Sequence, residues 1–295
     1  MNSSKAEVTI IVVIYKAWPL VFRCLKALKN ADIRGGRVIL VDNNSQEDIP
    51  NKVQNRFPSV EVVALNHNLL YTAANNLILR QCKEGKYVVL LNPDVELCTD
   101  TLECLLDFMN IYEDVGICGP KLILENGSID PACRRSKPTY IDVWAWILRL
   151  NRIFPSHKLL GHYNLTYLDS RAITDVDVVS GACMVIRRSI IDTVGVLDEQ
   201  FAMYGSDIDF CIRVREAGWR VVYNPTAQAL HTKRASTTYR QKWALVHFYD
   251  ELILLCNRYI AVETAKPLNY LLTFALQVRK YAHLFGIIIL PKLWK

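Results

Sequence analysis

Strand and helix patterns alternate along the first hundred residues, and this alternation constrains the fold more than any other feature of the sequence. Val8–Tyr15 is a continuous apolar run rich in β-branched residues, which is typical of a strand buried on both faces. Further strands are expected at Arg37–Val41, Val60–Leu65 and Tyr87–Leu91. Helical spacing of apolar residues predicts helices at Trp18–Asn30, Tyr71–Lys83 and Thr99–Tyr112. This order predicts βαβ units and a mostly parallel α/β sheet flanked by helices.

The pattern is less regular after Pro120. Gly127–Thr174 carries turn residues, aromatics and scattered basic residues, and we expect it to be a long excursion from the sheet. Regular patterns return with an expected strand at Val176–Arg187, an expected helix at Ser206–Ala217 and a last strand, Trp219–Tyr223, that ends at Asn224-Pro225.

Charge is unevenly spread along the 295 residues, whose formal net charge is +6. The first 228 residues sum to −1, whereas residues 229–295 carry ten basic and three acidic residues. From Thr237 onward the pattern is helical, basic and aromatic. We therefore expect an α/β domain over residues 1–236 and a helical, basic and aromatic C-terminal segment over residues 237–295. The aromatic and basic residues of that segment are compatible either with packing on the α/β domain or with an interfacial position on an anionic membrane. Nothing in the body supports binding of nucleic acid.

The cysteines and the apolar runs bear on where in the cell the protein is expected. Nine cysteines, none in a C-x-x-C pair, are expected to be reduced. Val8–Tyr15 is too short and too β-branched for a secretory signal. Pro267–Val278 and Tyr281–Pro291 are each too short to span a bilayer, and Arg279-Lys280 separates them. We expect a cytoplasmic protein, able to sit peripherally on the inner face of the cell membrane.

Polar clusters follow the carboxyl ends of the four expected strands. They are Tyr15-Lys16, Asp42-Asn43-Asn44-Ser45, Asn66-His67-Asn68 and Asn92-Pro93-Asp94. Short polar residues also make good turns, which explains any one cluster by itself. Four in succession favour a binding site, because ligands of parallel α/β sheets bind beyond these strand ends. Asp94, on a rigid Asn-Pro turn, suits Mg²⁺ or Mn²⁺ holding a diphosphate.

Motifs of other enzyme classes are absent from the sequence. There is no G-x-G-x-x-G after the first strand, which disfavours a dinucleotide-binding dehydrogenase. There is also no G-x-x-x-x-G-K-[ST] of a P-loop enzyme, no G-x-S-x-G elbow and no H-E-x-x-H helix.

Several ordered motifs together resemble family 2 glycosyltransferases with the GT-A fold. They are Val8–Tyr15, Val41–Ser45, Asn68–Asn76, Leu91–Asp94, Val179–Ile186, Gly195–Phe201, Met203–Cys211, Ala217–Trp219 and His231. The resemblance covers roughly Val8–Ser236. Within the family the chain looks most like the rhamnosyltransferase-type branch that builds bacterial surface polysaccharides.

The resemblance implies a nucleotide-binding group at the strand ends. Asp42 would hydrogen-bond the base of the nucleotide, as the acid after the second strand does in the family. Tyr15, Lys16, Asn44 and Asn92 would lie near the same nucleotide.

It also implies the residues of the reaction. Asp94 holds the last position of the D-x-D motif and would bind the metal, Mg²⁺ or Mn²⁺. His231 matches a histidine that approaches the diphosphate or its metal. Asp207 fills the second position of the Glu-Asp motif and would be the catalytic base. An acid in the first turn of a helix is also stabilised by the helix dipole, and Asp209, two residues on, points to a different face.

The chain departs from the family pattern at three positions. Asn92 replaces the first acid of D-x-D, Ser206 replaces the glutamate of Glu-Asp, and Leu70 replaces a glycine. These departures leave the fold unchanged and bear on donor choice and catalytic rate.

The resemblance thus implies a metal-dependent inverting glycosyltransferase. The donor would be a dTDP-, UDP- or GDP-linked sugar, and the acceptor a lipid-linked saccharide in bacterial surface polysaccharide synthesis. Two alternatives remain. A sugar-1-phosphate nucleotidyltransferase would need a glycine-rich loop where this chain has Lys16-Ala-Trp-Pro19. A catalytically silent nucleotide-sugar-binding subunit is compatible with Ser206.

Overall fold

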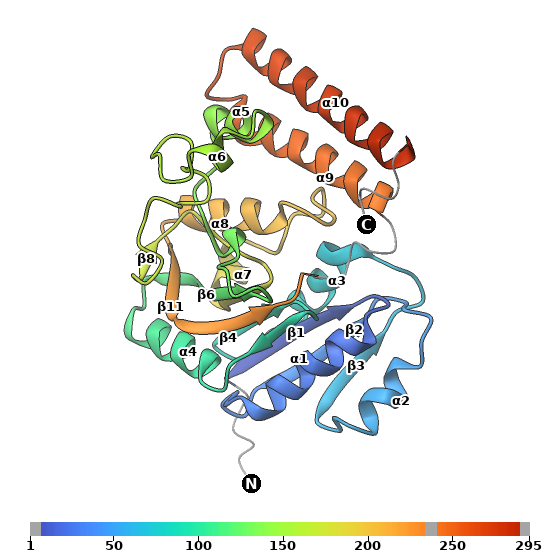
Figure 1. The fold of residues 1–295 in the computed structure, drawn as a ribbon. Helices are drawn as coiled ribbons and strands as arrows, with labels where there is room; N and C mark the ends of the chain where they lie inside the picture. Colours follow the sequence, from blue (N-terminus) through green and yellow to red (C-terminus); the bar gives the residue numbers. More distant parts are fainter. Residues whose placement is uncertain (1–6, 234–240, 290–295) are drawn as a thin grey trace.

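The computed structural model describes residues 7–233 and 241–289, and a mixed nine-stranded sheet forms its centre (Figure 1). Its strands are β1 (Val8–Ile14), β2 (Arg37–Asp42), β3 (Val60–Ala64), β4 (Tyr87–Leu91), β5 (Val95–Leu97), β6 (Val115–Leu124), β8 (Thr174–Asp175), β10 (Cys183–Arg187) and β11 (Arg220–His231). The order is β3-β2-β1-β4-β10-β6-β11-β5, with β8 beside β11. A small second sheet pairs β7 (Arg134–Arg135) with β9 (Val178–Val179).

Helices flank the sheet and form a separate group at one end of the molecule (Figure 1). They are α1 (Trp18–Asn30), α2 (Ile49–Gln54), α3 (Leu70–Leu79), α4 (Thr101–Ile111), α5 (Tyr140–Ile147), α6 (Leu150–Ile153), α7 (Ser189–Thr193), α8 (Ser206–Glu216), α9 (Gln241–Leu255) and α10 (Lys266–Ile289). A 3₁₀ turn covers Pro131–Cys133, and a π-helical turn, Cys256–Ile260, follows α9.

The parallel half of the sheet is built as the sequence predicts. Ile11 at the middle of β1 pairs with Ile39 of β2 and Leu90 of β4, both in parallel register. Every residue of β1 and β4 is buried, which is why these strands read as continuous apolar runs. β6 and β11 are also parallel, whereas β10 runs antiparallel to β4 and β6. The expected mostly parallel α/β architecture is confirmed.

Two expected strands have different limits in the structure. The single strand expected over Val176–Arg187 is two strands, β9 and β10, because the backbone turns at Ser180–Ala182 between them. The last strand was expected to end at Asn224-Pro225, and this was wrong. β11 continues to His231, and its pairing with β6 shifts register between Asn224 and Gln228. Pro225 is tolerated at this irregularity because a residue outside the ladder needs no N–H donor.

The segment expected to be an excursion contributes ordered structure. It contains the 3₁₀ turn, β7, α5 and α6, and α5 packs against the C-terminal helices. Val143 of α5 is buried in a small core with Leu272 and Leu276 of α10. Arg279 Nη1 donates to the carbonyl of Ile147 at 2.7 Å, which joins α10 to the end of α5.

The C-terminal helices are present, and the figure places α9 and α10 next to each other (Figure 1). Lys280 Nζ pairs with Asp250 at 2.6 Å, and Tyr249 is hydrogen-bonded to His283 at 2.9 Å. The boundary expected at Thr237 lies outside the described residues. Within the described residues, no helix combines the length and the apolar character that crossing a bilayer requires. None of the nine cysteines forms a disulfide.

Candidate active site

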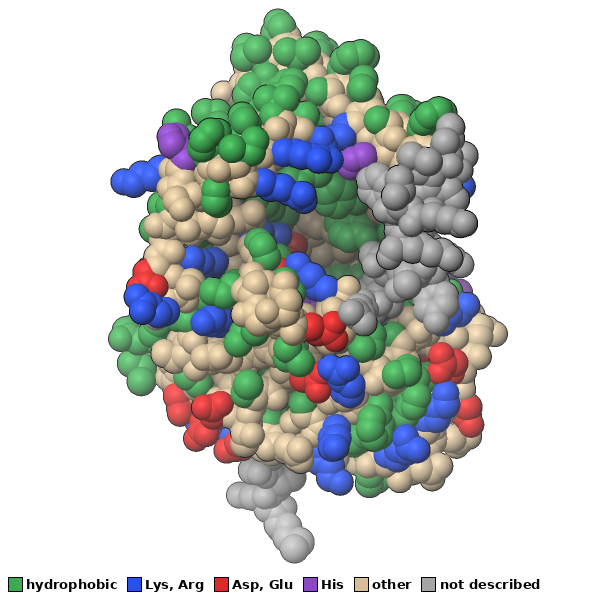
Figure 2. All heavy atoms as spheres, in the orientation of Figure 1, with side chains coloured by type: hydrophobic (Ala, Val, Ile, Leu, Met, Phe, Trp, Pro, Cys, Tyr) green, Lys and Arg blue, Asp and Glu red, His purple; other side chains and the backbone are tan. Residues whose placement is uncertain are grey.

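A cavity of about 730 Å³ lies beyond the carboxyl ends of β1 and β4, and Figure 2 shows the hollow between the sheet domain and the C-terminal helices. Its polar lining includes Tyr15, Asn92, Asp130, Arg135, Asp207 and His231. Its apolar wall comes from α5 and α9 and includes Val143, Trp146, Phe248, Leu252 and Leu255. An apolar cavity with a few convergent polar groups is the usual form of a ligand site.

His231, at the end of β11, lies between two carboxylates. Its Nε2 is 3.6 Å from Asp94 Oδ1, and its Nδ1 is 2.8 Å from Asp130 Oδ2. Lys233 Nζ lies 2.7 Å from the other oxygen of Asp130. Burial by itself would lower the pKa of His231, but the two carboxylates outweigh it and raise that pKa to about 9. Burial would raise the pKa of Asp130, yet hydrogen bonds from His231 and Lys233 lower it to about 2.

The same group of residues suits a divalent cation. Asn92 Oδ1 is buried and has no hydrogen-bond partner, so an oxygen donor is available on the cavity wall that His231 also lines. Across the described residues, no three His, Cys, Asp or Glu side chains gather into a ready metal cluster. Mg²⁺ and Mn²⁺ sites commonly use one or two protein carboxylates and take further ligands from phosphate and water. The donor set therefore fits such an ion only together with a diphosphate.

Asp207 sits in the first turn of α8 and reaches the cavity. Gly205, with φ of 78°, turns the chain into the helix in a conformation that favours glycine. Asp207 Oδ2 accepts hydrogen bonds from Arg135 at 2.6 Å and from the Gly181 N–H at 3.0 Å, while Oδ1 accepts from the Ile208 N–H at 2.9 Å. A carboxylate has about four lone-pair sites, so one remains for a ligand.

Gly181 and Arg135 fit closely around this carboxylate. A Cβ at position 181 would lie 3.2 Å from Asp207 Cβ, so glycine allows the backbone N–H to approach. Arg135 comes from β7 and is buried. Burial would lower its pKa, but the charge of Asp207 and the hydroxyl of Tyr163 raise it, so the guanidinium stays charged.

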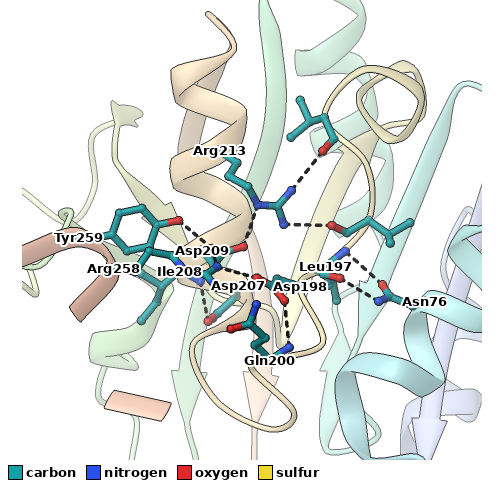
Figure 3. Close-up of polar contacts among 12 residues, drawn as sticks. Asn76, Leu197, Asp198, Gln200, Asp207, Ile208, Asp209, Arg213, Arg258 and Tyr259 are labelled. Atoms are coloured by element: carbon teal, nitrogen blue, oxygen red, sulfur yellow. Dashed lines mark hydrogen bonds and ion pairs between the residues drawn. The ribbon is translucent and has the colours of Figure 1, made fainter. Parts of the chain in front are cut away.

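Asp209 has a different environment, which Figure 3 shows. It is completely buried and does not line the cavity. Its carboxylate accepts from Arg213 at 2.8 Å, from Arg258 at 2.7 Å and from the Tyr259 hydroxyl at 2.7 Å. Arg258 also pairs with Asp198 at 2.6 Å. Asp209 therefore ties α8 to the π-helical turn, on a different face from Asp207, as the helical spacing predicts.

The expected nucleotide-binding residues divide into two groups. Tyr15 and Asn92 line the cavity, whereas Lys16, Asp42 and Asn44 do not. Asp42 is buried at the end of β2, and its Oδ1 accepts from the Ser45 N–H at 3.0 Å, which is the turn-forming contact that short polar residues favour. Ser45 Oγ in turn accepts from the Lys16 N–H at 3.0 Å, so these residues share one turn beside the cavity.

Three residues of the site had no signal in the sequence. Asp130 and Arg135 lie in the segment expected to be an excursion, and Glu251 lies in α9. Glu251 accepts the backbone N–H of Met203 at 3.1 Å and of Tyr204 at 2.6 Å, in the loop that leads to Asp207. The partners named here lie 47 to 103 residues away in the chain, beyond the reach of any local pattern.

Family models match most of the chain. Residues 9–195 match the model described as glycosyl transferase family 2, and residues 154–294 match glycosyl transferase family group 2. The chain belongs to glycosyl transferase family 2. This family 2 chain is 29% identical to an N-acetylglucosaminyl-diphospho-decaprenol L-rhamnosyltransferase of Mycobacterium tuberculosis over 297 residues, which cover 92% of this chain and 91% of the relative. It is 27% identical to the rhamnosyltransferase WbbL of Escherichia coli, over 68% of this chain and 75% of the relative. It is an inverting, rhamnosyltransferase-like glycosyltransferase, as its motifs imply.

Solved structures share the architecture of this glycosyltransferase. A Pyrobaculum calidifontis mannosyltransferase in complex with GDP-Man and Mn²⁺ superposes with a TM-score of 0.58 at 18% identity, covering 98% of this chain and 73% of that one. GalNAc-T7 with UDP, GalNAc and Mn²⁺ gives 0.59 at 12% identity, with 80% of this chain and 45% of that one covered. These likenesses confirm the GT-A fold.

Proposed function

We propose that the enzyme transfers a sugar from a nucleotide-diphosphate sugar to a hydroxyl of a lipid-linked saccharide in bacterial surface polysaccharide synthesis, with a divalent metal ion. The observation that carries this proposal is the meeting of Asn92, Asp207 and His231 in one cavity, with Asp94 against His231. Support for the acceptor class comes from the Mycobacterium tuberculosis relative, whose name states a diphospho-decaprenol acceptor. The donor is a dTDP-, UDP- or GDP-linked sugar.

Asp94, His231 and Asn92 would hold Mg²⁺ or Mn²⁺, which supplies positive charge against the departing diphosphate. Asp130 fixes the imidazole of His231 from its other nitrogen, the arrangement that commonly orients a metal-binding histidine. When no metal is bound, the raised pKa of His231, about 9, keeps its imidazole protonated at neutral pH. The imidazole then carries a positive charge beside Asp94. Tyr15, Lys16, Asp42, Asn44 and Asn92 form the nucleotide edge in this proposal.

Asp207 acts as the general base in the proposed reaction. The acceptor hydroxyl donates to the remaining lone pair of its carboxylate and attacks the anomeric carbon from the face opposite the diphosphate. The new oxygen–carbon bond forms, the bond to the diphosphate breaks, and the hydroxyl proton passes to Asp207. Arg135 and the Gly181 N–H hold the carboxylate in place during this step.

In this proposal the two expected parts of the chain contact different substrates. Residues 1–236 would bind the nucleotide sugar, and residues 237–295 would add α9 as the apolar wall on the acceptor side. We also propose a peripheral location at the inner face of the cell membrane, where a lipid-linked acceptor is held.

Titration calorimetry tests the nucleotide and metal site. UDP, dTDP and GDP are titrated with Mn²⁺, and the tightest of the three is used for the variants. Asp94→Ala should abolish the Mn²⁺-dependent part of binding, because it removes the carboxylate aimed at the metal. Asp42→Ala should weaken binding with and without Mn²⁺. Asp107→Ala, which removes a surface acid paired with Arg34, is the control and should bind normally. Unchanged affinity in Asp94→Ala would overturn the metal assignment.

A further inference from the structure

Exposed large apolar side chains are concentrated at one end of the molecule. Sixteen such side chains occur among the described residues, and thirteen of them lie in two segments, 141–159 and 262–285. The same end appears in Figure 2 as a continuous gathering of hydrophobic side chains above the cavity, where Figure 1 places α5 and α10. A concentration of this kind marks an interaction surface, whereas scattered exposed residues do not.

α10 is apolar on two faces. One face buries Leu272 and Leu276 in the core shared with α5. The other exposes Tyr270 by 75%, Phe274 by 67% and Phe285 by 64%, at spacings that keep them on one side of the helix. Aromatic rings are the side chains most suited to the boundary between lipid headgroups and acyl chains.

Residues 148–159, which run from the end of α5 through α6 into the loop after it and are called the α5–α6 corner, add positive charge to this surface. Leu148, Ile153, Phe154 and Leu159 are exposed there. The exposed cations Arg149, Arg152 and Lys158 stand between them in the chain. Residues 143–168 and 264–295 contain no Asp or Glu at all. Glu263, the one acid in segment 262–285, pairs with Lys137. The surface therefore combines bulky apolar groups with a net positive charge.

The two segments are physically continuous, and the basic residues in the middle of α10 serve to join them. Arg279 lies over the ring of Trp146, 4.5 Å from its centre, and donates to the Ile147 carbonyl. Lys280 is buried against Asp250. These two basic residues are therefore occupied internally, and the solvent-facing cations come from the corner and from Lys266 at the start of α10.

We propose that the α5–α6 corner and the outer face of α10, together called the docking face, bind the surface of an anionic bilayer. The inference rests on the proposed function in one respect: it places the cavity, walled by Trp146 and Leu160, beside a membrane that holds the acceptor. Charge decides between a membrane and a second copy of the chain. A symmetric dimer through this face would bring like charges together, whereas anionic headgroups complement them.

Vesicle flotation of the full chain tests the docking face. The chain should float with vesicles of phosphatidylcholine and phosphatidylglycerol, and only weakly with phosphatidylcholine alone. The triple variant Arg149→Gln/Arg152→Gln/Lys158→Gln should partition about 10²-fold less onto the anionic vesicles, given the usual contribution of each cation. The charge-matched control Lys26→Gln/Lys29→Gln/Lys83→Gln, which changes exposed lysines elsewhere, should float like the parent.

The apolar half of the face has its own variant. Phe274→Ser/Tyr281→Ser/Phe285→Ser changes only exposed side chains and should also lose flotation, whereas Ile111→Ser, 73% exposed on α4, should not. Two outcomes would overturn the proposal: a parent chain that stays unbound at low salt, or a dimer in sedimentation that the apolar variant converts to monomer without any vesicle binding. Because flotation needs no substrate, a chain that floats but transfers no sugar contradicts the proposed function alone.

Discussion

Asp207 is the residue on which the proposed reaction depends, and its surroundings specify what its loss should do. Three donors occupy its carboxylate and hold it at the cavity, so the side chain is fixed before substrate arrives. Asp207→Asn keeps the size of the side chain but cannot take up a proton at neutral pH. Turnover should fall by about 10²-fold or more, while calorimetric affinity for the nucleotide is kept. Near-normal turnover in Asp207→Asn would assign the base to another group.

The contact between Asp130 and His231 leads to a second prediction about a single residue. It holds Nδ1 of His231, so that Nε2 faces Asp94. Asp130→Asn should weaken Mn²⁺ binding in the presence of the nucleotide by about 10- to 100-fold, the usual effect of losing such an orienting group. Lys233→Gln is the control, because it removes the other partner of Asp130 and leaves the histidine contact in place. An unchanged Mn²⁺ affinity in Asp130→Asn would show that His231 needs no orienting carboxylate.

At the scale of elements, Asp209 connects α8 to the π-helical turn by accepting hydrogen bonds from Arg258 and Tyr259. Breaking a buried ion pair typically costs about 3–5 kcal/mol because the remaining charge is left buried. Asp209→Asn should lower the free energy of unfolding by the lower end of this range, about 3 kcal/mol, because Arg213 loses its carboxylate partner whereas Arg258 keeps Asp198. Asp192→Asn, in an exposed pair with Arg188, should cost less than about 1 kcal/mol. Urea denaturation measures both, and equal effects would contradict the structural role of Asp209.

The elements that the sequence predicted well are those with a strong local period. The apolar residues of β1, α1 and β4 recur at short spacings within each element. α1 and β4 begin and end at the expected residues. β11 was misjudged because a proline is an obstacle only within a regular ladder, and the register shift beside Pro225 is a tertiary feature. Tyr15 and Asn92 could be placed at the cavity from the sequence, because each directly follows a strand with a strong local pattern.

The parts of the site that were missed depend on contacts between distant residues. Arg135 meets Asp207 across 72 residues, and Asp130 meets His231 across 101. Neither residue stands in a motif or a periodic pattern, because its position is set by where β7 and the 3₁₀ turn pack. The family resemblance supplied Asp207 and His231, while their partners became visible only in three dimensions.

For the whole molecule, the cavity unites both halves of the chain. The sheet provides the polar floor at its strand ends, and α5 and α9 provide the apolar wall. Glu251 of α9 holds the backbone of the loop before Asp207, so the C-terminal helices also help to position the proposed base. A polar floor for the proposed nucleotide sugar and an apolar wall from α5 and α9 together suit the proposed acceptor, which is part sugar and part lipid.

The central claim is that this cavity performs sugar transfer with inversion, and proton NMR of the product tests it most directly. The chain is incubated with Mn²⁺, a lipid-linked saccharide and each of the UDP-, dTDP- and GDP-sugars, and the anomeric centre of the new linkage is compared with that of the donor. We predict a product of inverted configuration, formed by the parent chain and nearly absent with Asp207→Asn. A product with retained configuration, or a chain that binds the nucleotide sugar and yields no product with any donor, would contradict the account.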